Sequence, residues 1–178
     1  MTDSIEISTR LEQWAEVAGY TLTPGHRTDD GRAVLWAAAG EIRLFIGNSR
    51  DGWFLITDSD RMGAEHFVLA APAMSTIEKY LFGRFCSHIR SAHGLPRVGV
   101  PMSEDGWRSD YSIQTRDFQG AQHFALIAAD GSTVAVSSAD RVTAAAELRK
   151  FALFLTATID QIEASAVDPD GKPLFERR

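Results

Sequence analysis

The sequence predicts an α+β fold with an antiparallel sheet of about seven strands, two long helices and a short N-terminal helix. Short apolar segments joined by short turns indicate antiparallel meanders, and a long amphipathic pattern follows each group. A phrase at Asp51–Arg61, DGWFLITDSDR, is nearly repeated at Asp130–Arg141 as DGSTVAVSSADR. This repetition indicates a pseudo-repeat, in which a strand hairpin is followed by a helix.

The N-terminal helix is predicted within Thr9–Tyr20. Its apolar residues Leu11, Trp14 and Ala15 fall at helical spacing, and Gly19 ends the pattern. Thr9 and Glu12 have the spacing of a capping box, in which the two side chains satisfy free backbone amides.

Seven strands follow from alternating or continuously apolar runs bounded by turn residues. They are expected at Arg32–Gly40, Glu41–Ser49, Gly52–Ser59, Glu65–Pro72, Tyr111–Asp117, Gln122–Ala129 and Ser132–Ser138. The first four make one meander that ends at Pro72. The pattern leaves open whether the two halves of the chain share one sheet or form two.

Two long helices are predicted at Met74–Gly94 and at about Arg141–Ser165. Ser75 and Glu78 give the first helix another capping-box pattern, and Gly94 is its stop signal. Asp140 is the expected N-cap of the second helix. Asp-Gly in each repeated phrase supplies a tight turn, and we interpret the later Asp-Arg pairs as local capping rather than as binding sites.

Length and charge limit the possible functions. A chain of 178 residues corresponds to one domain, 1–178, and buries roughly 70% of the surface that its unfolded form exposes. With 18 Lys and Arg against 24 Asp and Glu, the net charge is −6 and the basic residues are scattered, which argues against nucleic-acid binding. The N-terminal stretch lacks the pattern of a secretory signal, and no apolar run approaches a membrane span. We therefore expect a cytoplasmic protein.

The residues that usually carry catalysis or bind metals form no known motif here. The five histidines lack metal-ligand spacing, the carboxylates lie in turns, and Cys86 fits a buried core thiol. The sequence therefore nominates no catalytic residue, metal site or cofactor. An enzyme assembled from distant strands remains an alternative, and a deep cleft lined by His66 and His123 would support it.

Several motifs resemble a bacterial immunity-protein family, the one typified by the immunity factor for tuberculosis necrotizing toxin. They are YLFGRF and IRSAHGLPRV within Tyr80–Val98, SSADRV before the last helix, and DPDGKPLF at Asp168–Phe175. The resemblance starts at LEQWAEVAGY, from Leu11, and extends to Phe175. It implies a non-enzymatic antitoxin that binds a cognate toxin, an NAD glycohydrolase domain, and occludes its substrate site. The net charge of −6 agrees, since it would steer the protein toward the basic cleft of such a toxin.

None of these motifs is a contact motif, so the candidate contacts rest on physical arguments. Trp107 is a rigid aromatic side chain in a polar segment and is our candidate anchor, whereas Trp53 better fits the core. The partner-binding candidates are Arg10, Arg50, Asp51, Glu104, Asp105, Trp107 and Arg108. A cytoplasmic secretion-associated chaperone or another protein-binding module is the alternative function.

Overall fold

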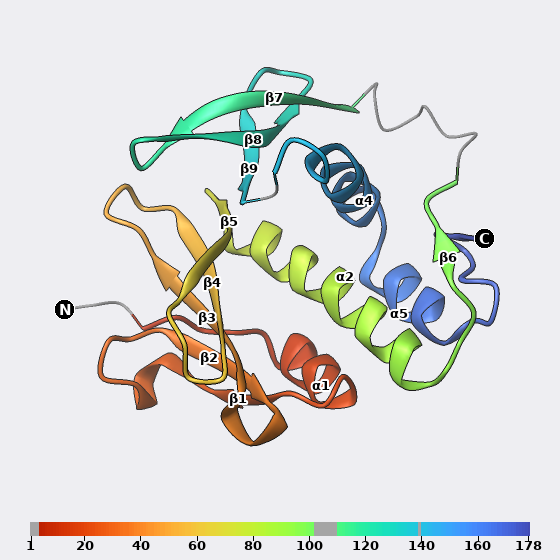
Figure 1. The fold of residues 1–178 in the computed structure, drawn as a ribbon, viewed down its shortest axis with the longest axis horizontal. Helices are drawn as coiled ribbons and strands as arrows, with labels where there is room; N and C mark the ends of the chain where they lie inside the picture. Colours follow the sequence, from red (N-terminus) through yellow and green to blue (C-terminus); the bar gives the residue numbers. More distant parts are fainter. Residues whose placement is uncertain (1–3, 102–109, 139) are drawn as a thin grey trace.

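The computed structural model describes residues 4–101, 110–138 and 140–178. Eight strands form one sheet in the order β1-β2-β3-β4-β5-β9-β8-β7, and each neighbouring pair is antiparallel (Figure 1). The strands are β1 Thr21–Thr23, β2 Ala33–Ala37, β3 Ile42–Asn48, β4 Phe54–Asp60, β5 His66–Ala71, β7 Tyr111–Phe118, β8 Ala121–Ala128 and β9 Thr133–Ser137. The predicted α+β class is confirmed.

Each half of the chain contributes an antiparallel meander followed by a helix. Strands β1 to β5 form the first meander, and strands β7 to β9 form the second. The meanders join where β5 pairs with β9, with Leu69 opposite Ser137 and Ala70 opposite Val136. The two halves therefore share one sheet. The repeated phrases occupy different places in it, because the first leads into a middle strand, β4, and the second into the joining strand, β9.

The α-helices in the described residues lie together on one side of the sheet (Figure 1). They are α1 Thr9–Val17, α2 Met74–Ala92, α4 Ala144–Thr156 and α5 Ile159–Val167, and α2 contacts each of the others. None of these helices combines the length and the apolar character needed to cross a bilayer.

The last predicted helix is divided in the structure. A second helix, α5, starts after Thr158, whose Oγ1 accepts a hydrogen bond from the Gln161 backbone nitrogen at 3.1 Å. The Gln161 side chain accepts one in return from the Thr158 nitrogen at 2.9 Å. This reciprocal capping box turns the chain between α4 and α5.

The other predicted caps have mixed outcomes. Asp140 is not the N-cap of α4, which is Thr143. Its carboxylate instead accepts hydrogen bonds from the Val142 and Thr143 nitrogens in the turn that enters the helix. Ser8, rather than Thr9, caps α1. The box at Ser75 is wrong: Glu78 accepts 2.8 Å hydrogen bonds from the nitrogen and the hydroxyl of Ser8. Glu78 thus ties the start of α1 to α2 instead of capping its own helix.

The main core lies between the sheet and the helices. Its largest fully buried side chains include Phe82 and Phe85 of α2. Between them Gly83 allows close helix packing, since a Cβ placed there would lie 2.2 Å from a ring carbon of Phe154 in α4.

One buried cation fastens the C-terminal part of the chain. Arg90 of α2 is 6% exposed. Its guanidinium donates to the carbonyl oxygens of Ser165 at 2.7 Å and Asp168 at 2.5 Å, at the end of α5. It also donates to those of Pro96 at 3.0 Å and Pro169 at 3.1 Å. Four carbonyls from two segments are therefore satisfied by one side chain, next to the negative end of the α5 dipole.

Two short strands complete this region. Strand β6 (Val98–Gly99) pairs with β10 (Glu176–Arg177) apart from the main sheet. The C-terminal residues are thereby held beside the segment that follows α2.

Candidate functional site

Arg50 and Asp51 lie at the exposed tip of the turn between β3 and β4. The Ser49 nitrogen donates to the Trp53 carbonyl at 2.7 Å, and the Gly52 nitrogen donates to the Ser49 carbonyl at 3.2 Å. Gly52 has a φ of +77°, a conformation that costs glycine little and other residues more. The two predicted contact residues therefore project into solvent from a well-defined turn.

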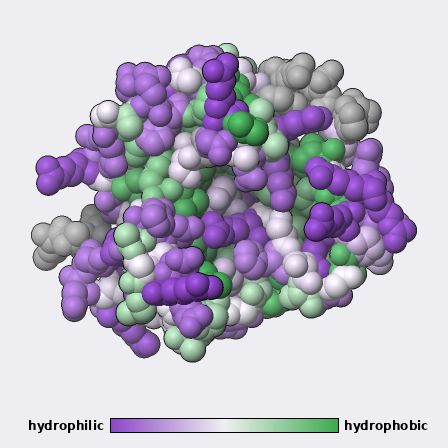
Figure 2. All heavy atoms as spheres, in the orientation of Figure 1, coloured by the Kyte–Doolittle hydropathy of each residue, from purple (hydrophilic) through white to green (hydrophobic). Residues whose placement is uncertain are grey.

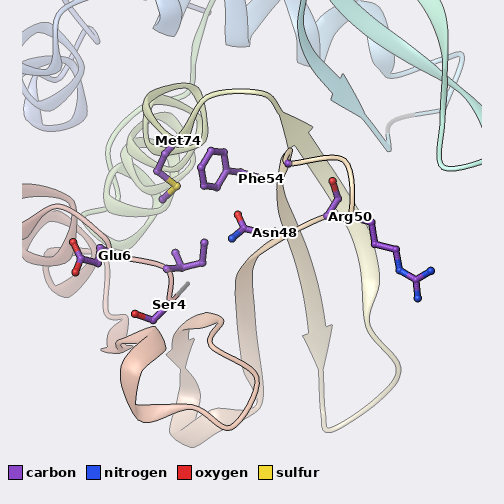
Figure 3. A pocket seen from close by; sticks show the side chains of 9 residues that line it. Ser4, Glu6, Asn48, Arg50, Phe54 and Met74 are labelled. Carbon is purple, nitrogen blue, oxygen red and sulfur yellow. The ribbon is translucent and has the colours of Figure 1, made fainter. Parts of the chain in front are cut away.

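A hollow of about 520 Å³ lies beside this turn (Figure 3). The ring of Phe54 and the side chain of Met74 lie together on one wall, the Asn48 side chain points inward, and the Arg50 side chain extends away. The hollow is lined by Ser4, Ile5, Glu6, Asn48, Ser49, Arg50, Gly52, Phe54 and Met74. An apolar wall with a polar rim suits a protruding side chain from a protein partner.

The N-terminal wall of the hollow is fixed to the body of the protein. The nitrogen of Ile5 donates to the carbonyl of Gly31 at 2.9 Å, and the Ile5 side chain is buried. Gly25 allows this close approach, because a Cβ there would lie 2.8 Å from the Ile5 backbone. With Ser8 held by Glu78, the segment is anchored at both ends.

Trp53 belongs to a second apolar cluster on the face of the sheet opposite the helices. Strand alternation places Trp53 and Leu55 on that face, while Phe54 and Ile56 pack in the main core. The ring of Trp53 lies 5.4 Å from that of Phe118. We refer to Trp53, Phe67, Phe118 and His123 as the aromatic cluster. Trp53 is half-buried in this cluster and is therefore outside the main core.

An ion-pair network covers a neighbouring part of the same face. Arg32 donates to both carboxylate oxygens of Glu65, at 2.7 and 3.1 Å, and to Asp30 at 2.6 Å. Its guanidinium also lies 4.5 Å from the ring centre of Phe45. The hydrogen bonds from Arg32 lower the pKa of the Glu65 carboxyl below its usual value. These charges are already paired with one another. This area is therefore a weaker candidate for partner binding than the exposed turn at Arg50 and Asp51.

Arg10 is exposed but engaged within the protein. Its guanidinium donates to Glu163 at 3.1 and 3.0 Å and also to Asp160, both in α5. These carboxylates raise the pKa of Arg10, first through the hydrogen bonds with Glu163. Arg10 therefore links α1 to α5, and it would have to leave these partners to bind another protein.

The other predicted contacts, Glu104, Asp105, Trp107 and Arg108, lie outside the described residues, and their role stays a prediction. The sequence did not predict the hollow, because no local sequence pattern indicates that residues 4–6 lie beside the β3–β4 hairpin. The aromatic cluster could have been predicted, because the alternation of side chains along β4 places Trp53 on the face of the sheet opposite the main core.

The described residues contain no group of three or more His, Cys, Asp or Glu side chains that could hold a metal ion. His66 is exposed on β5, while His123 packs against Phe67 with ring centres 5.1 Å apart. Cys86 is fully buried, and burial raises the pKa of its thiol to about 11. A buried thiol that stays protonated is a poor nucleophile.

We expect Cys86 to resist Ellman's reagent in the native protein at neutral to mildly alkaline pH. Its thiolate is scarce and inaccessible, whereas an unfolded cysteine has a pKa of about 8.5 and reacts readily. The release of thionitrobenzoate, followed with and without denaturant, checks this. Fast reaction of the native protein would contradict the burial of Cys86.

Comparisons with known proteins cover nearly the whole chain. The family model described as Immunity protein 61 matches residues 14–174. The immunity factor for TNT of Mycobacterium tuberculosis (strain ATCC 25618 / H37Rv) is 39% identical over 175 residues, covering 98% of this chain and 96% of that protein. A homolog of that factor in Mycobacterium bovis (strain BCG / Pasteur 1173P2) gives the same values. The solved structure of Rv3902c from M. tuberculosis superposes with a TM-score of 0.87 at 37% identity, covering 99% of this chain and 98% of that one.

Proposed function

The chain belongs to the Immunity protein 61 family, and we propose on this basis that it binds a cognate NAD glycohydrolase toxin domain and occludes its substrate site. The observation that carries the proposal is the full-length similarity to the immunity factor for TNT. An immunity protein acts as a non-enzymatic antitoxin, so inhibition depends on surface complementarity alone. We place its action in the cytoplasm of the cell that makes the toxin.

Charge supports this pairing. A toxin that binds the pyrophosphate of NAD needs basic groups in its cleft, and this chain has a net charge of −6. Opposite charges raise the association rate above that of neutral partners, and salt screens the effect. Inhibitor binding should therefore slow as ionic strength rises.

The tip at Arg50 and Asp51, with the adjacent hollow, is the contact surface that the described residues support best. The tip is exposed, and neither side chain is ion-paired with a described residue. The turn is closed by backbone hydrogen bonds, so binding costs little ordering of its backbone. We propose that the hollow receives a side chain of the toxin.

Occlusion makes a direct prediction about competition. If inhibitor and NAD occupy the same toxin cleft, a non-hydrolysable NAD analogue should raise the apparent Kd of the complex in proportion to its own concentration. The measurement is a binding titration by fluorescence anisotropy at several analogue concentrations. An unchanged Kd at saturating analogue would show that inhibition does not use occlusion.

Replacing Trp107 with alanine should weaken toxin binding by about 2 kcal/mol or more, because buried aromatic anchors dominate interface energies. Calorimetric titration of both proteins with the toxin measures the change. An unchanged melting temperature would show that the variant is folded. A loss of less than about 1 kcal/mol would exclude Trp107 as the anchor.

A further inference from the structure

A recess of about 810 Å³ opens between the C-terminal part of α2, strand β6 and α4. Five basic side chains line it, namely Arg90, Arg97, Arg149, Lys150 and Arg178, against one carboxylate side chain, Glu147. We call this the basic recess. Figure 1 shows β6, the C-terminus, α4 and α5 together on the right, and Figure 2 shows hydrophilic residues gathered on that side of the molecule.

The pairing of β6 with β10 brings the backbones of two of these residues together. The Arg178 nitrogen donates to the Arg97 carbonyl at 3.2 Å, so the two residues are neighbours across the paired segments. The Arg178 side chain lies across Gly99, where a Cβ would be 2.5 Å from its Nε. Two cations on neighbouring segments of one recess repel each other, and a bound anion would relieve that repulsion.

Helix α4 supplies two more cations from the opposite wall. Arg149 donates to the Pro101 carbonyl at 3.0 Å, and it forms no ion pair with a described residue. Lys150 donates to the Ser87 hydroxyl, a neutral acceptor, at 2.8 Å, and no described carboxylate forms an ion pair with it. A guanidinium and an ammonium that no described carboxylate pairs with are both donors suited to an anionic oxygen.

Within the described parts of the chain, no ion pair includes any of the five cations of the basic recess. Arg90 is committed to its four carbonyls and acts as a structural part of the wall. For the other four, the lining side chains include one carboxylate, that of Glu147. Because the whole chain has a net charge of −6, the surface outside the recess is more negative still.

We propose that the basic recess binds a small ligand that carries a diphosphate group. Its volume is within the range of small-molecule sites, about 300 to 1,000 Å³. The cations converge from three elements on one concave space, and the negative charge elsewhere opposes an extended polyanion such as nucleic acid. The site does not depend on toxin binding, and its assay contains no toxin.

Calorimetric titration with inorganic pyrophosphate and with ADP, at low ionic strength, tests the proposal. We expect a Kd of about 1 mM or tighter for pyrophosphate, weakening as salt is added. Arg97→Gln and Arg178→Gln should each weaken binding about tenfold, because each removes one charged donor. Arg27→Gln, at an exposed arginine outside the recess, is the matched control and should leave binding unchanged.

Tighter binding of ADP than of pyrophosphate identifies a nucleotide ligand, and equal binding identifies the diphosphate alone. Both results support the proposal that the basic recess binds a diphosphate group. Absence of binding to the wild type, or equal losses in Arg27→Gln and the recess variants, would overturn it. If a recess variant fails to fold, amide chemical shifts of the wild-type protein decide: Ser91 and Gly99 should move on adding pyrophosphate, and unmoved shifts would also overturn the proposal.

Discussion

Replacing Arg90 with methionine should lower the free energy of unfolding by about 3 to 5 kcal/mol. Methionine fills much of the same space but cannot donate hydrogen bonds. Four carbonyl oxygens would then lose the hydrogen bonds that they receive from Arg90 in a largely water-free site. The Asp168 carbonyl would keep the hydrogen bond from the Gly171 nitrogen. We expect the C-terminal segment, including α5 and β10, to loosen first.

Urea unfolding followed by circular dichroism measures this loss. Arg84→Met is a matched control on the same helix, since Arg84 reaches Asp58 only at 3.8 Å and such pairs contribute about 0 to 1 kcal/mol. Equal losses of unfolding free energy in the two variants would contradict the role of Arg90 in holding the C-terminal part of the chain.

Replacing Gly83 with valine should destabilise the protein by about 3 kcal/mol, at the upper end of typical overpacking costs. A Cβ at this position would lie 2.2, 2.3 and 2.8 Å from three ring carbons of Phe154. Phe154 is itself buried, so it cannot swing away freely. The α2–α4 contact would have to open.

A double-mutant cycle with Phe154→Ala isolates this clash. With the ring removed, the further cost of Gly83→Val should fall to a small fraction of its value in the wild type. Denaturant unfolding of the four proteins provides the data. Strictly additive losses would mean that close packing of Gly83 on Phe154 is not the cause.

Strand segments were predictable because each carries a local pattern. Asp-Gly turns and apolar alternation located seven strands, and the structure adds only the three-residue β1 to the main sheet. The joining of β5 to β9 was not predictable, since pairing between distant segments has no local signal. It depends on how both meanders pack against the same helices.

The helix boundaries show where tertiary contacts override local signals. Leu155, Ile159 and Ile162 continue the apolar stripe, which hid the break before Thr158, although Thr158 and Gln161 have capping-box spacing. Conversely, Ser75 and Glu78 have that spacing without forming a box, because Glu78 binds Ser8 across 70 residues.

Some residues of the candidate sites were predictable from local sequence, and others depend on contacts between distant segments. Arg50 and Asp51 were predictable at an exposed tip, because Asp-Gly fixes the turn locally. Arg10 was expected to face a partner but pairs with α5, a contact across about 150 residues. The basic recess gathers residues that are scattered in the sequence, so only the folded chain brings them together.

The central claim is that this chain silences an NAD glycohydrolase toxin by binding it. The most direct measurement adds the protein in steps to the purified toxin domain and follows NAD loss against molar ratio. We predict a linear fall in activity that reaches zero near one equivalent, as tight stoichiometric inhibition requires. Undiminished NAD loss at excess inhibitor, with a complex still visible by size exclusion, would contradict the claim and favour a chaperone.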